Sequence, residues 1–203
     1  MLSLQDCCDF CSLSEDEVAA IADPDPRMVA DCLKLISEKG GKKPDVYDKG
    51  DHDYLNLLKD KNIDAVVIAS PWEWHSQQAI AAMQAGKYVG TEVCGGFSLD
   101  ECWQLVETVE KTQQVYMLAE NYCYMRPNMM VRHLVEQGVF GELTYAEGAY
   151  IHDCRYLVFE ESGQTTWRGD FRRNYNGNGY PTHSLGPVAQ WLGINRGDRL
   201  VST

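Results

Sequence analysis

Short apolar runs alternate with amphipathic stretches through roughly the first 120 residues of this 203-residue chain. The apolar runs, which we expect to be strands, are residues 17–22, 46–47, 63–69, 88–92 and 115–119. The amphipathic stretches, which we expect to be helices, are residues 28–36, 53–59, 77–85 and 100–113. Strands that alternate with helices in this way predict an α/β fold with a doubly wound parallel sheet and right-handed crossovers.

The pattern changes after Asn121. The segments expected there are a helix (127–137), a turn (138–141), a long alternating strand (143–152) and a polar, loop-rich stretch (153–179). A change from helix-strand alternation to one long alternating strand indicates that a second domain has begun. We therefore expect two domains, residues 1–121 and residues 122–203, of which the second is α+β.

Composition narrows the range of partners. The formal net charge is −12, and the densest basic cluster, Arg168 with Arg172 and Arg173, is short. Binding to a phosphate backbone depends on clustered Lys and Arg that release counterions, so we expect no nucleic-acid partner. No apolar run approaches the roughly 18 residues of a membrane span, and the N-terminus lacks a basic region followed by an apolar one. We expect no membrane partner and a cytoplasmic location by default, with export open if an upstream signal is missing.

The eight cysteines lie at irregular spacings among the helix and strand patterns. A chain with this much apolar sequence favours reduced, buried thiols over a disulfide framework. Cys8 and Cys11 have the spacing of a zinc or redox pair, but no second such pair and no closely spaced histidine follows. We therefore expect no metal site.

The sequence Tyr180-Pro-Thr-His183 is the strongest candidate for chemistry. It lies between the glycine-rich residues 175–179 and the sequence Ser184-Leu-Gly-Pro187. An imidazole and a phenol three positions apart, in a loop punctuated by glycine and proline, form a pair held by backbone geometry rather than by apolar packing. We expect this pair to transfer protons.

Several segments resemble one known group of enzymes. The segments similar to the glucose-fructose oxidoreductase, inositol dehydrogenase and MocA (Gfo/Idh/MocA) superfamily are residues 63–71, 85–89, 91–93 and 140–142. The segments that, within this superfamily, resemble glycoside hydrolase family 109 are Glu92-Val93, Leu118-Ala-Glu-Asn121 and Tyr180 to Pro187. Members of that family are NAD-dependent α-N-acetylgalactosaminidases. The resemblance covers roughly residues 17–203.

The resemblance implies a Rossmann-like domain followed by a substrate domain built on an open antiparallel sheet. The superfamily begins with a strand and a glycine-rich turn that brings the cofactor pyrophosphate to a helix N-terminus, and no G-x-G-x-x-G occurs before Glu17. Residues 1–12 are similar to the tail of the helix after that turn. The family's second domain also extends well beyond residue 203, so we expect an internal fragment or a truncated product with both domains incomplete.

The resemblance also implies NAD as the cofactor. Asp23, at the carboxyl end of the first strand, would accept the adenosine ribose hydroxyls and disfavour a 2′-phosphate, although it could instead be an N-cap of the next helix. The other implied cofactor-binding residues are Trp72, Glu73, Trp74, His75, Glu92, Val93, Asn121 and Tyr180. The alternative for the two indole rings is that they cover the protein surface and do not bind the cofactor.

Two positions distinguish the chemistries within the superfamily. Its dehydrogenases usually have Glu-Lys-Pro where this chain has Glu92-Val93-Cys94, and they place an aspartate four residues before the active-site histidine, where this chain has Gly179. Of a Lys/Asp/His relay, only His183 is present. The Tyr/His arrangement of family 109 is therefore favoured over plain polyol dehydrogenation. In addition, Cys94-Gly-Gly96 replaces a more usual Pro-Ala-Ala and predicts a looser loop.

Family 109 uses bound NAD transiently in glycoside hydrolysis. Oxidation of the sugar 3-hydroxyl acidifies the C2 proton, elimination releases the C1 substituent, water adds and hydride returns, so paired carboxylates are not required. The resemblance implies proton-transfer roles for His183 and Tyr180. The implied substrate-binding residues are Tyr150, Arg168, Tyr180, Pro181, Thr182 and His183.

Structural alternatives exist for each of these residues. Tyr150 could be a strand aromatic, Arg168 an ion-pair partner in a loop, and His183 a helix-capping imidazole. Two other functions also stay open, an NAD-dependent sugar or polyol oxidoreductase and an inactive fragment. The expected partner is a small-molecule sugar or glycoside, and a homo-oligomer is left open.

Overall fold

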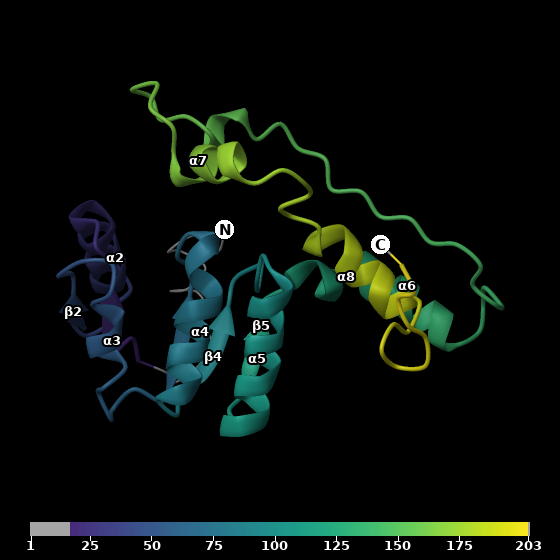
Figure 1. Cartoon of the computed structure of the whole chain (residues 1–203), viewed down its shortest axis with the longest axis horizontal. Helices are drawn as coiled ribbons and strands as arrows, with labels where there is room; N and C mark the ends of the chain where they lie inside the picture. The colour runs from purple at the N-terminus through teal and green to yellow at the C-terminus, as the bar shows by residue number, and fades with distance from the viewer. Residues whose placement is uncertain (1–16, 203) are drawn as a thin grey trace. The chain divides into compact units, whose positions relative to one another are not determined.

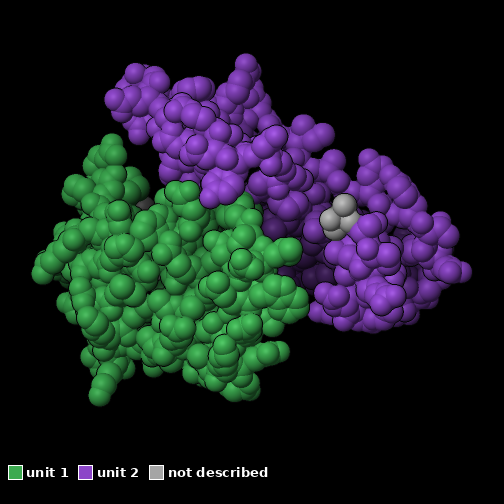
Figure 2. All heavy atoms as spheres, viewed as in Figure 1, with its two compact units in different colours: residues 1–118 green, residues 119–203 purple. Residues whose placement is uncertain are grey.

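The computed structural model of the chain describes residues 17–202. The chain divides into two compact units, residues 1–118 and residues 119–203, which Figure 2 shows in different colours. The first unit is built on parallel strands, and the second is helical and irregular. The segment 1–12, predicted to be the end of a helix, and the Cys8/Cys11 pair lie outside the described residues.

The first unit alternates strands and helices in the predicted order. Its strands are β1 (Ala20–Ala22), β2 (Asp45–Tyr47), β3 (Ala65–Ile68), β4 (Tyr88–Thr91) and β5 (Tyr116–Leu118). Its helices are α2 (Pro26–Glu38), α3 (Tyr54–Leu57), the 3-10 helix η1 (Trp72–Trp74), α4 (His75–Gln84) and α5 (Leu99–Thr112). All ladders between these strands are parallel, in two sheets with the orders β1-β2 and β3-β4-β5. The predicted α/β fold with a parallel sheet is confirmed.

Helices cover both faces of β1. Ile21 packs with Cys32 and Ile36 of α2, whereas the preceding residue, Ala20, packs against a larger core that includes Leu57 of α3. Successive side chains of a strand point to opposite faces, so these two contacts lie on opposite sides of the strand. This is the doubly wound arrangement that the alternation of strands and helices predicts.

The sheet β3-β4-β5 packs one face against α4 and α5, which lie side by side (Figure 1). The buried residues of this core that come from β3, β4, α4 and α5 are Ile68, Val89, Ala79, Ala82, Met83 and Leu105. Alternate strand residues on the other face, Val67, Tyr88 and Met117, are about half exposed (48%, 54% and 53%). The two faces of this sheet therefore differ in burial among the described residues.

Side-chain caps fix the start of two helices in the first unit. Ser98 accepts the N–H of Glu101 at 3.1 Å, and the Glu101 carboxylate accepts the N–H of Ser98 at 3.0 Å, which is a capping box at the start of α5. Asp25 caps α2, because its carboxylate accepts the N–H of Arg27 at 2.8 Å. Ser98 is therefore the N-cap of α5, and the cap of α2 is Asp25 rather than Asp23.

The second unit consists of short helices joined by long irregular segments. Its helices are the 3-10 helix η2 (Asn121–Tyr124), α6 (Arg126–Glu136), the 3-10 helix η3 (Arg155–Leu157), α7 (Trp167–Asn174) and α8 (Thr182–Trp191). Side chains join α6 to α8, since Trp191 Nε1 donates to the Asn128 carbonyl at 3.1 Å and Arg132 donates to Gln190 at 3.2 Å. These bonds hold α8 against the start of the unit.

Two secondary-structure predictions for this unit are wrong, and a third is incomplete. Residues 143–152 form no strand, because an extended segment needs a ladder partner and none lies beside it among residues 17–202. The stretch predicted to be loop-rich also contains η3 and α7, and Thr166 caps α7 by accepting the N–H of Gly169 at 3.3 Å. The segment around His183 is the first turn of α8, which continues through Pro187. Glycine and proline around a short helix led to the loop prediction.

The part of the chain that the structure describes contains no helix long and apolar enough to cross a membrane. Within that part, the cysteines outside disulfide bonds are Cys32, Cys94, Cys102, Cys123 and Cys154.

Candidate functional site

Asp23 directly follows β1, at the carboxyl end of the strand. Its Oδ1 accepts the N–H of Asp25 at 2.8 Å, and its own N–H donates to the Tyr47 carbonyl at 3.2 Å. Burial raises the pKa of Asp23 above its ordinary value; the hydrogen bond from Asp25 opposes this rise, and the charge of Asp25 adds to it. Because Asp25 caps α2, the N-cap alternative for Asp23 is not what the structure shows. The Asp23 carboxylate lies where an acid that binds ribose is expected.

Trp72 to His75 follow β3 as η1 and the start of α4. Trp72 is buried with its ring centroid 6.2 Å from that of Phe97, and Trp74 is half-buried with its ring edge-on to His52 at 5.4 Å. Glu73 is exposed. The two indole rings therefore pack against neighbouring rings and do not form the surface cover considered as an alternative.

His75 is enclosed by backbone. Its side chain is fully buried, with Nδ1 2.8 Å from the Cys94 carbonyl and Nε2 2.8 Å from the Ser70 carbonyl. The next residue, Ser76, donates its hydroxyl to the Gly95 carbonyl at 2.9 Å. The first turn of α4 thus joins the end of β3 to the loop after β4, and two side chains hold the loop that the sequence predicts to be loose. A contact between His75 and NAD stays a prediction.

Glu92 and Val93 directly follow β4 and are both buried. The N–H of Glu92 donates to the Ile68 carbonyl at 2.9 Å, and the N–H of Val93 meets Glu92 Oε2 at 3.3 Å. Valine has no group that could relay a proton, so this strand end offers one carboxylate and backbone. Asn121, in the second unit, is the exposed first residue of η2.

The first unit fits a dinucleotide in part. An acidic side chain follows β1, aromatic rings follow β3 and a buried carboxylate follows β4, all at the carboxyl edge where open α/β sheets bind ligands. A glycine-rich turn that would meet a pyrophosphate is not present among residues 17–202. The residues present therefore suit the two nucleoside ends of the dinucleotide better than its pyrophosphate.

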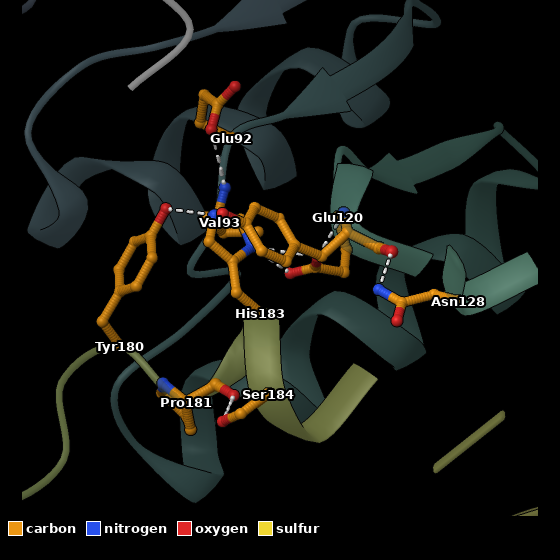
Figure 3. Close-up of polar contacts among 9 residues, drawn as sticks. Glu92, Val93, Glu120, Asn128, Tyr180, Pro181, His183 and Ser184 are labelled. Carbon is orange, nitrogen blue, oxygen red and sulfur yellow. Dashed lines mark hydrogen bonds and ion pairs between the residues drawn. The ribbon is translucent and has the colours of Figure 1, made fainter. Parts of the chain in front are cut away.

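In the second unit, His183 lies at the centre of a chain of hydrogen bonds (Figure 3). It belongs to the first turn of α8, and its side chain is 8% exposed. Its Nε2 is 3.1 Å from the Tyr180 hydroxyl, and its Nδ1 is 2.9 Å from each carboxylate oxygen of Glu120. The structure brings together the two residues predicted to transfer protons and adds a third.

Glu120 is a candidate site residue that the sequence reasoning missed. It follows β5, its side chain is 11% exposed, and Oε1 also accepts the N–H of Tyr122 at 2.8 Å. The sequence Leu118-Ala-Glu-Asn121 contained a signal, but Glu120 and His183 are 63 positions apart and no spacing rule joins them. Glu120 thus places a carboxylate beside His183, although position 179 is a glycine.

A glycine allows α8 to approach Glu120 closely. Gly186 lies one helical turn after His183, and a Cβ atom there would lie 2.9 Å from Cys123 Sγ and 3.0 Å from Glu120 Cγ. Residues three apart lie on the same face of a helix, so the glycine and the histidine face the same neighbour. The absence of a side chain at position 186 is therefore part of what places the carboxylate against the imidazole.

Two tyrosine rings flank His183. Tyr122 stacks on the imidazole with ring centroids 4.2 Å apart and an interplanar angle of 17°, and Tyr150 meets it edge-on at 4.8 Å. Burial raises the pKa of Tyr150, and a side-chain hydrogen bond with Tyr122 raises it further. Tyr150 thus lies beside the imidazole as a protonated phenol, although the strand predicted to carry it does not form.

The other predicted substrate residues come from α7 and the start of α8. The Arg168 guanidinium lies 4.1 Å from the centroid of the Trp167 ring, and burial lowers its pKa while the charge of Tyr180 acts in the opposite direction. Pro181 precedes the first residue of α8, which is Thr182. The buried Oγ1 of Thr182 has no hydrogen-bond partner among the described residues, so it could bind a ligand.

Comparison with known proteins identifies both units. Residues 5–120 match the family described as oxidoreductase family, NAD-binding Rossmann fold, and residues 124–203 match the family described as glycosyl hydrolase 109, C-terminal domain. Glycosyl hydrolase family 109 protein 2 of Shewanella sp. (strain ANA-3) is 47% identical over 192 residues, which cover 94% of this chain and 42% of that protein. A glycosyl hydrolase family 109 protein of Shewanella pealeana is 44% identical over 191 residues, with the same coverage. The chain therefore spans less than half the length of these relatives.

Solved structures agree on the fold. Myo-inositol 2-dehydrogenase from Lactobacillus plantarum superposes with a TM-score of 0.67 at 19% identity, over 86% of this chain and 48% of that one. Levoglucosan dehydrogenase, solved in complex with NADH and levoglucosan, gives a TM-score of 0.51 at 25% identity, over 62% of this chain and 32% of that one. The chain belongs to the oxidoreductase family with the NAD-binding Rossmann fold, whose cofactor is NAD, and is similar within it to the glycosyl hydrolase family 109 proteins.

Proposed function

We propose that the chain acts on α-N-acetylgalactosaminides and hydrolyses them with bound NAD as a transient hydride carrier. The observation that carries the proposal is the hydrogen-bonded chain Glu120–His183–Tyr180, which joins a buried carboxylate, an imidazole and a phenol. The family matches support an enzyme that uses NAD and acts on a sugar. The particular sugar and the hydrolytic reaction are the finer part of the proposal.

The hydrogen-bonded chain is suited to moving one proton. An ionised carboxylate only accepts hydrogen bonds, so Nδ1 of His183 carries a proton and donates a hydrogen bond to Glu120. In the neutral ring, Nε2 then accepts the hydroxyl proton of Tyr180. When Nε2 is protonated, it donates to the Tyr180 oxygen instead, and the charge of Glu120 stabilises the imidazolium. The Tyr180/His183 pair can therefore take a proton from a bound sugar and return it.

The same residues fit an elimination route. Bound NAD would supply the hydride acceptor for oxidation at the sugar C3, with the O3 proton leaving to solvent, and the hydride and a proton would return after hydrolysis. The pair accepts the C2 proton, which the neighbouring ketone has made acidic, while the C1 substituent leaves with the electrons of its bond. The pair exchanges this proton with solvent and then protonates C2 as water adds at C1, while the proton that the water loses goes to the departed substituent. One carboxylate beside the histidine suffices for this chemistry, whereas most glycosidases use two carboxylates across the scissile bond.

Three further side chains are suited to hold the sugar. The protonated Tyr150 phenol and the Arg168 guanidinium are hydrogen-bond donors, which match sugar hydroxyl oxygens and an acetamido carbonyl. The unpartnered Thr182 hydroxyl can donate or accept. For the cofactor, we assign Asp23 to the adenosine ribose. We assign the other residues predicted for NAD to the rest of the cofactor: Trp72, Glu73, Trp74, His75, Glu92, Val93, Asn121 and Tyr180.

An NAD-dependent sugar oxidoreductase is the second candidate function. It is favoured by the carboxylate-paired histidine, because such a pair can also accept the hydroxyl proton of an alcohol as hydride leaves. Against it stands Val93, which supplies no proton relay at the end of β4. The two candidates differ in whether the glycosidic bond breaks.

An isotope experiment separates the two functions. The 203-residue chain, supplied with NAD, is incubated with p-nitrophenyl α-N-acetylgalactosaminide in deuterated water. The expected result is release of nitrophenol and deuterium at C2 of the sugar, both absent from a His183→Ala control, with no net NADH. Stoichiometric NADH without nitrophenol would establish the oxidoreductase instead, and the absence of both products would overturn the proposed activity for this chain.

A further inference from the structure

Tyr122 touches both halves of the candidate site. It is the second residue of η2 and is half-buried. One face of its ring stacks on His183, and the ring stands at 89° to Tyr150, with centroids 5.2 Å apart. After burial, the Tyr122 side chain is the next cause of the raised pKa of Tyr150. The ring of Tyr122 therefore contacts both the residue predicted to transfer protons and a residue predicted to bind the sugar.

The backbone of Tyr122 is fixed on both sides. Its N–H donates to Glu120 Oε1 at 2.8 Å, and its carbonyl accepts from Asn128 Nδ2 at 2.7 Å, a bond drawn in Figure 3. The carboxylate that binds His183 is thus also bound by the residue that stacks on His183. A tyrosine whose main chain is held at two points has little freedom to move its ring away from the imidazole.

We propose that Tyr122 is a positioning residue that joins the proton-transfer chain to the sugar-binding side of the site. Its ring face limits rotation of the His183 imidazole, which keeps Nδ1 on Glu120 and Nε2 toward Tyr180. Its hydroxyl holds the Tyr150 phenol in one orientation. The two roles reside in different parts of one side chain, so substitutions can separate them. The kinetic part of this inference rests on the proposed function.

The matched variants are Tyr122→Phe, Tyr122→Leu and, as a control, Tyr124→Leu. Phenylalanine keeps the ring and removes the hydroxyl, so KM for the nitrophenyl glycoside is expected to rise about 3- to 10-fold, the effect of one hydrogen bond, with kcat within about 2-fold. Leucine removes the ring as well, and kcat is expected to fall about 10- to 100-fold, as when other supports of a catalytic group are removed. Tyr124 lies on the same 3-10 helix, is 68% exposed, and should change neither constant.

A spectroscopic measurement tests the inference independently of turnover. The ring proton resonances of His183, identified by their loss in a His183→Gln variant, should be displaced by the ring current of Tyr122. The displacement should persist in Tyr122→Phe and in the Tyr124→Leu control, and disappear in Tyr122→Leu. Circular dichroism checks that each variant is folded. If Tyr122→Leu does not fold, Tyr122→Phe still tests the inference.

The outcomes separate the two proposals. If the wild-type chain turns over no glycoside, the proposed function fails, and Tyr122 is then judged by the resonances and by calorimetric titration of the nitrophenyl glycoside. Resonances that do not differ between wild type and Tyr122→Leu overturn the positioning role toward His183. A Tyr122→Phe variant with unchanged KM and unchanged glycoside affinity overturns the role toward Tyr150.

Discussion

The two units place their candidate functional groups by different means. In the first unit, Asp23 and Glu92 lie where they do because parallel strands end at a common edge. In the second unit, Glu120, His183 and Tyr180 come from a 3-10 helix cap and the start of a separate helix, and their own hydrogen bonds hold them together. The first arrangement follows from the backbone, whereas the second depends on individual side chains. Single substitutions should therefore harm the second unit more.

The largest expected effect is at Glu120. Glu120→Gln keeps an acceptor for His183 Nδ1 but removes the charge that stabilises the imidazolium, so kcat should fall about 10²- to 10⁴-fold. Steady-state kinetics on the nitrophenyl glycoside measures it. Glu136→Gln is the control, because Glu136 is exposed on α6 and pairs with Arg132. A Glu120→Gln variant with wild-type kcat would show that the carboxylate has no part in the chemistry.

A pair of glycine substitutions compares the packing of the two units. Gly186→Ala would place a Cβ 2.9 Å from Cys123 Sγ and 3.0 Å from Glu120 Cγ, so it should lower the free energy of unfolding by about 1–3 kcal/mol. Gly90→Ala in β4 meets no atom within 4 Å, so the free energy of unfolding should change by less than about 0.5 kcal/mol. Urea denaturation measures both. Equal midpoints for the two variants would contradict the close approach of α8 to Glu120.

The smallest expected effect is at Asp23, and it has opposite signs for stability and binding. Because burial raises the pKa of Asp23, the charged carboxylate is disfavoured in the folded state, and this loss of stability develops as pH rises above the ordinary value of 3.8. Asp23→Asn should therefore raise the thermal unfolding midpoint slightly at pH 7 and leave it unchanged below pH 3.8. The same substitution should weaken NAD binding about 10-fold, an effect that the loss of one charged hydrogen bond can account for.

The neighbouring Asp25 gives a control of opposite sign for that experiment. The hydrogen bonds from Arg27 lower the pKa of Asp25, so its charged form is favoured in the folded state above the ordinary value of 3.8. Asp25→Asn should lower the thermal midpoint at pH 7 by a small amount, because the pair is exposed to solvent. If both variants move the midpoint in the same direction, burial does not set the ionisation of Asp23.

The fold of the first unit could be predicted because its signals are local. The apolar run 63–69 becomes β3, and Ser98 caps α5 as its sequence indicates. His75 shows where local reasoning ends, because its burial depends on the carbonyl of Cys94, 19 positions away. The position of a residue at a strand end predicts the edge on which it lies, but not whether its side chain faces a ligand.

The second unit could be predicted less well because its contacts are not local. Glu120 and His183 are 63 positions apart, and an acid with no fixed spacing from the histidine gives no sequence pattern to search for. The alternating segment 143–152 predicts a strand, but a strand forms only where another strand can pair with it. The Tyr180/His183 pair could be predicted because its members are only three positions apart in the sequence.

Gly186 has a consequence for how the sequence of α8 is interpreted. A Cβ atom one helical turn after His183 would lie 3.0 Å from Glu120 Cγ, so the close approach of α8 to this carboxylate needs a position without a side chain. The glycine three positions after His183 therefore records a contact with a distant segment of the chain, although it contributes no atom to the proton-transfer residues themselves. A substitution at Gly186 and a substitution at Glu120 would act on the same contact.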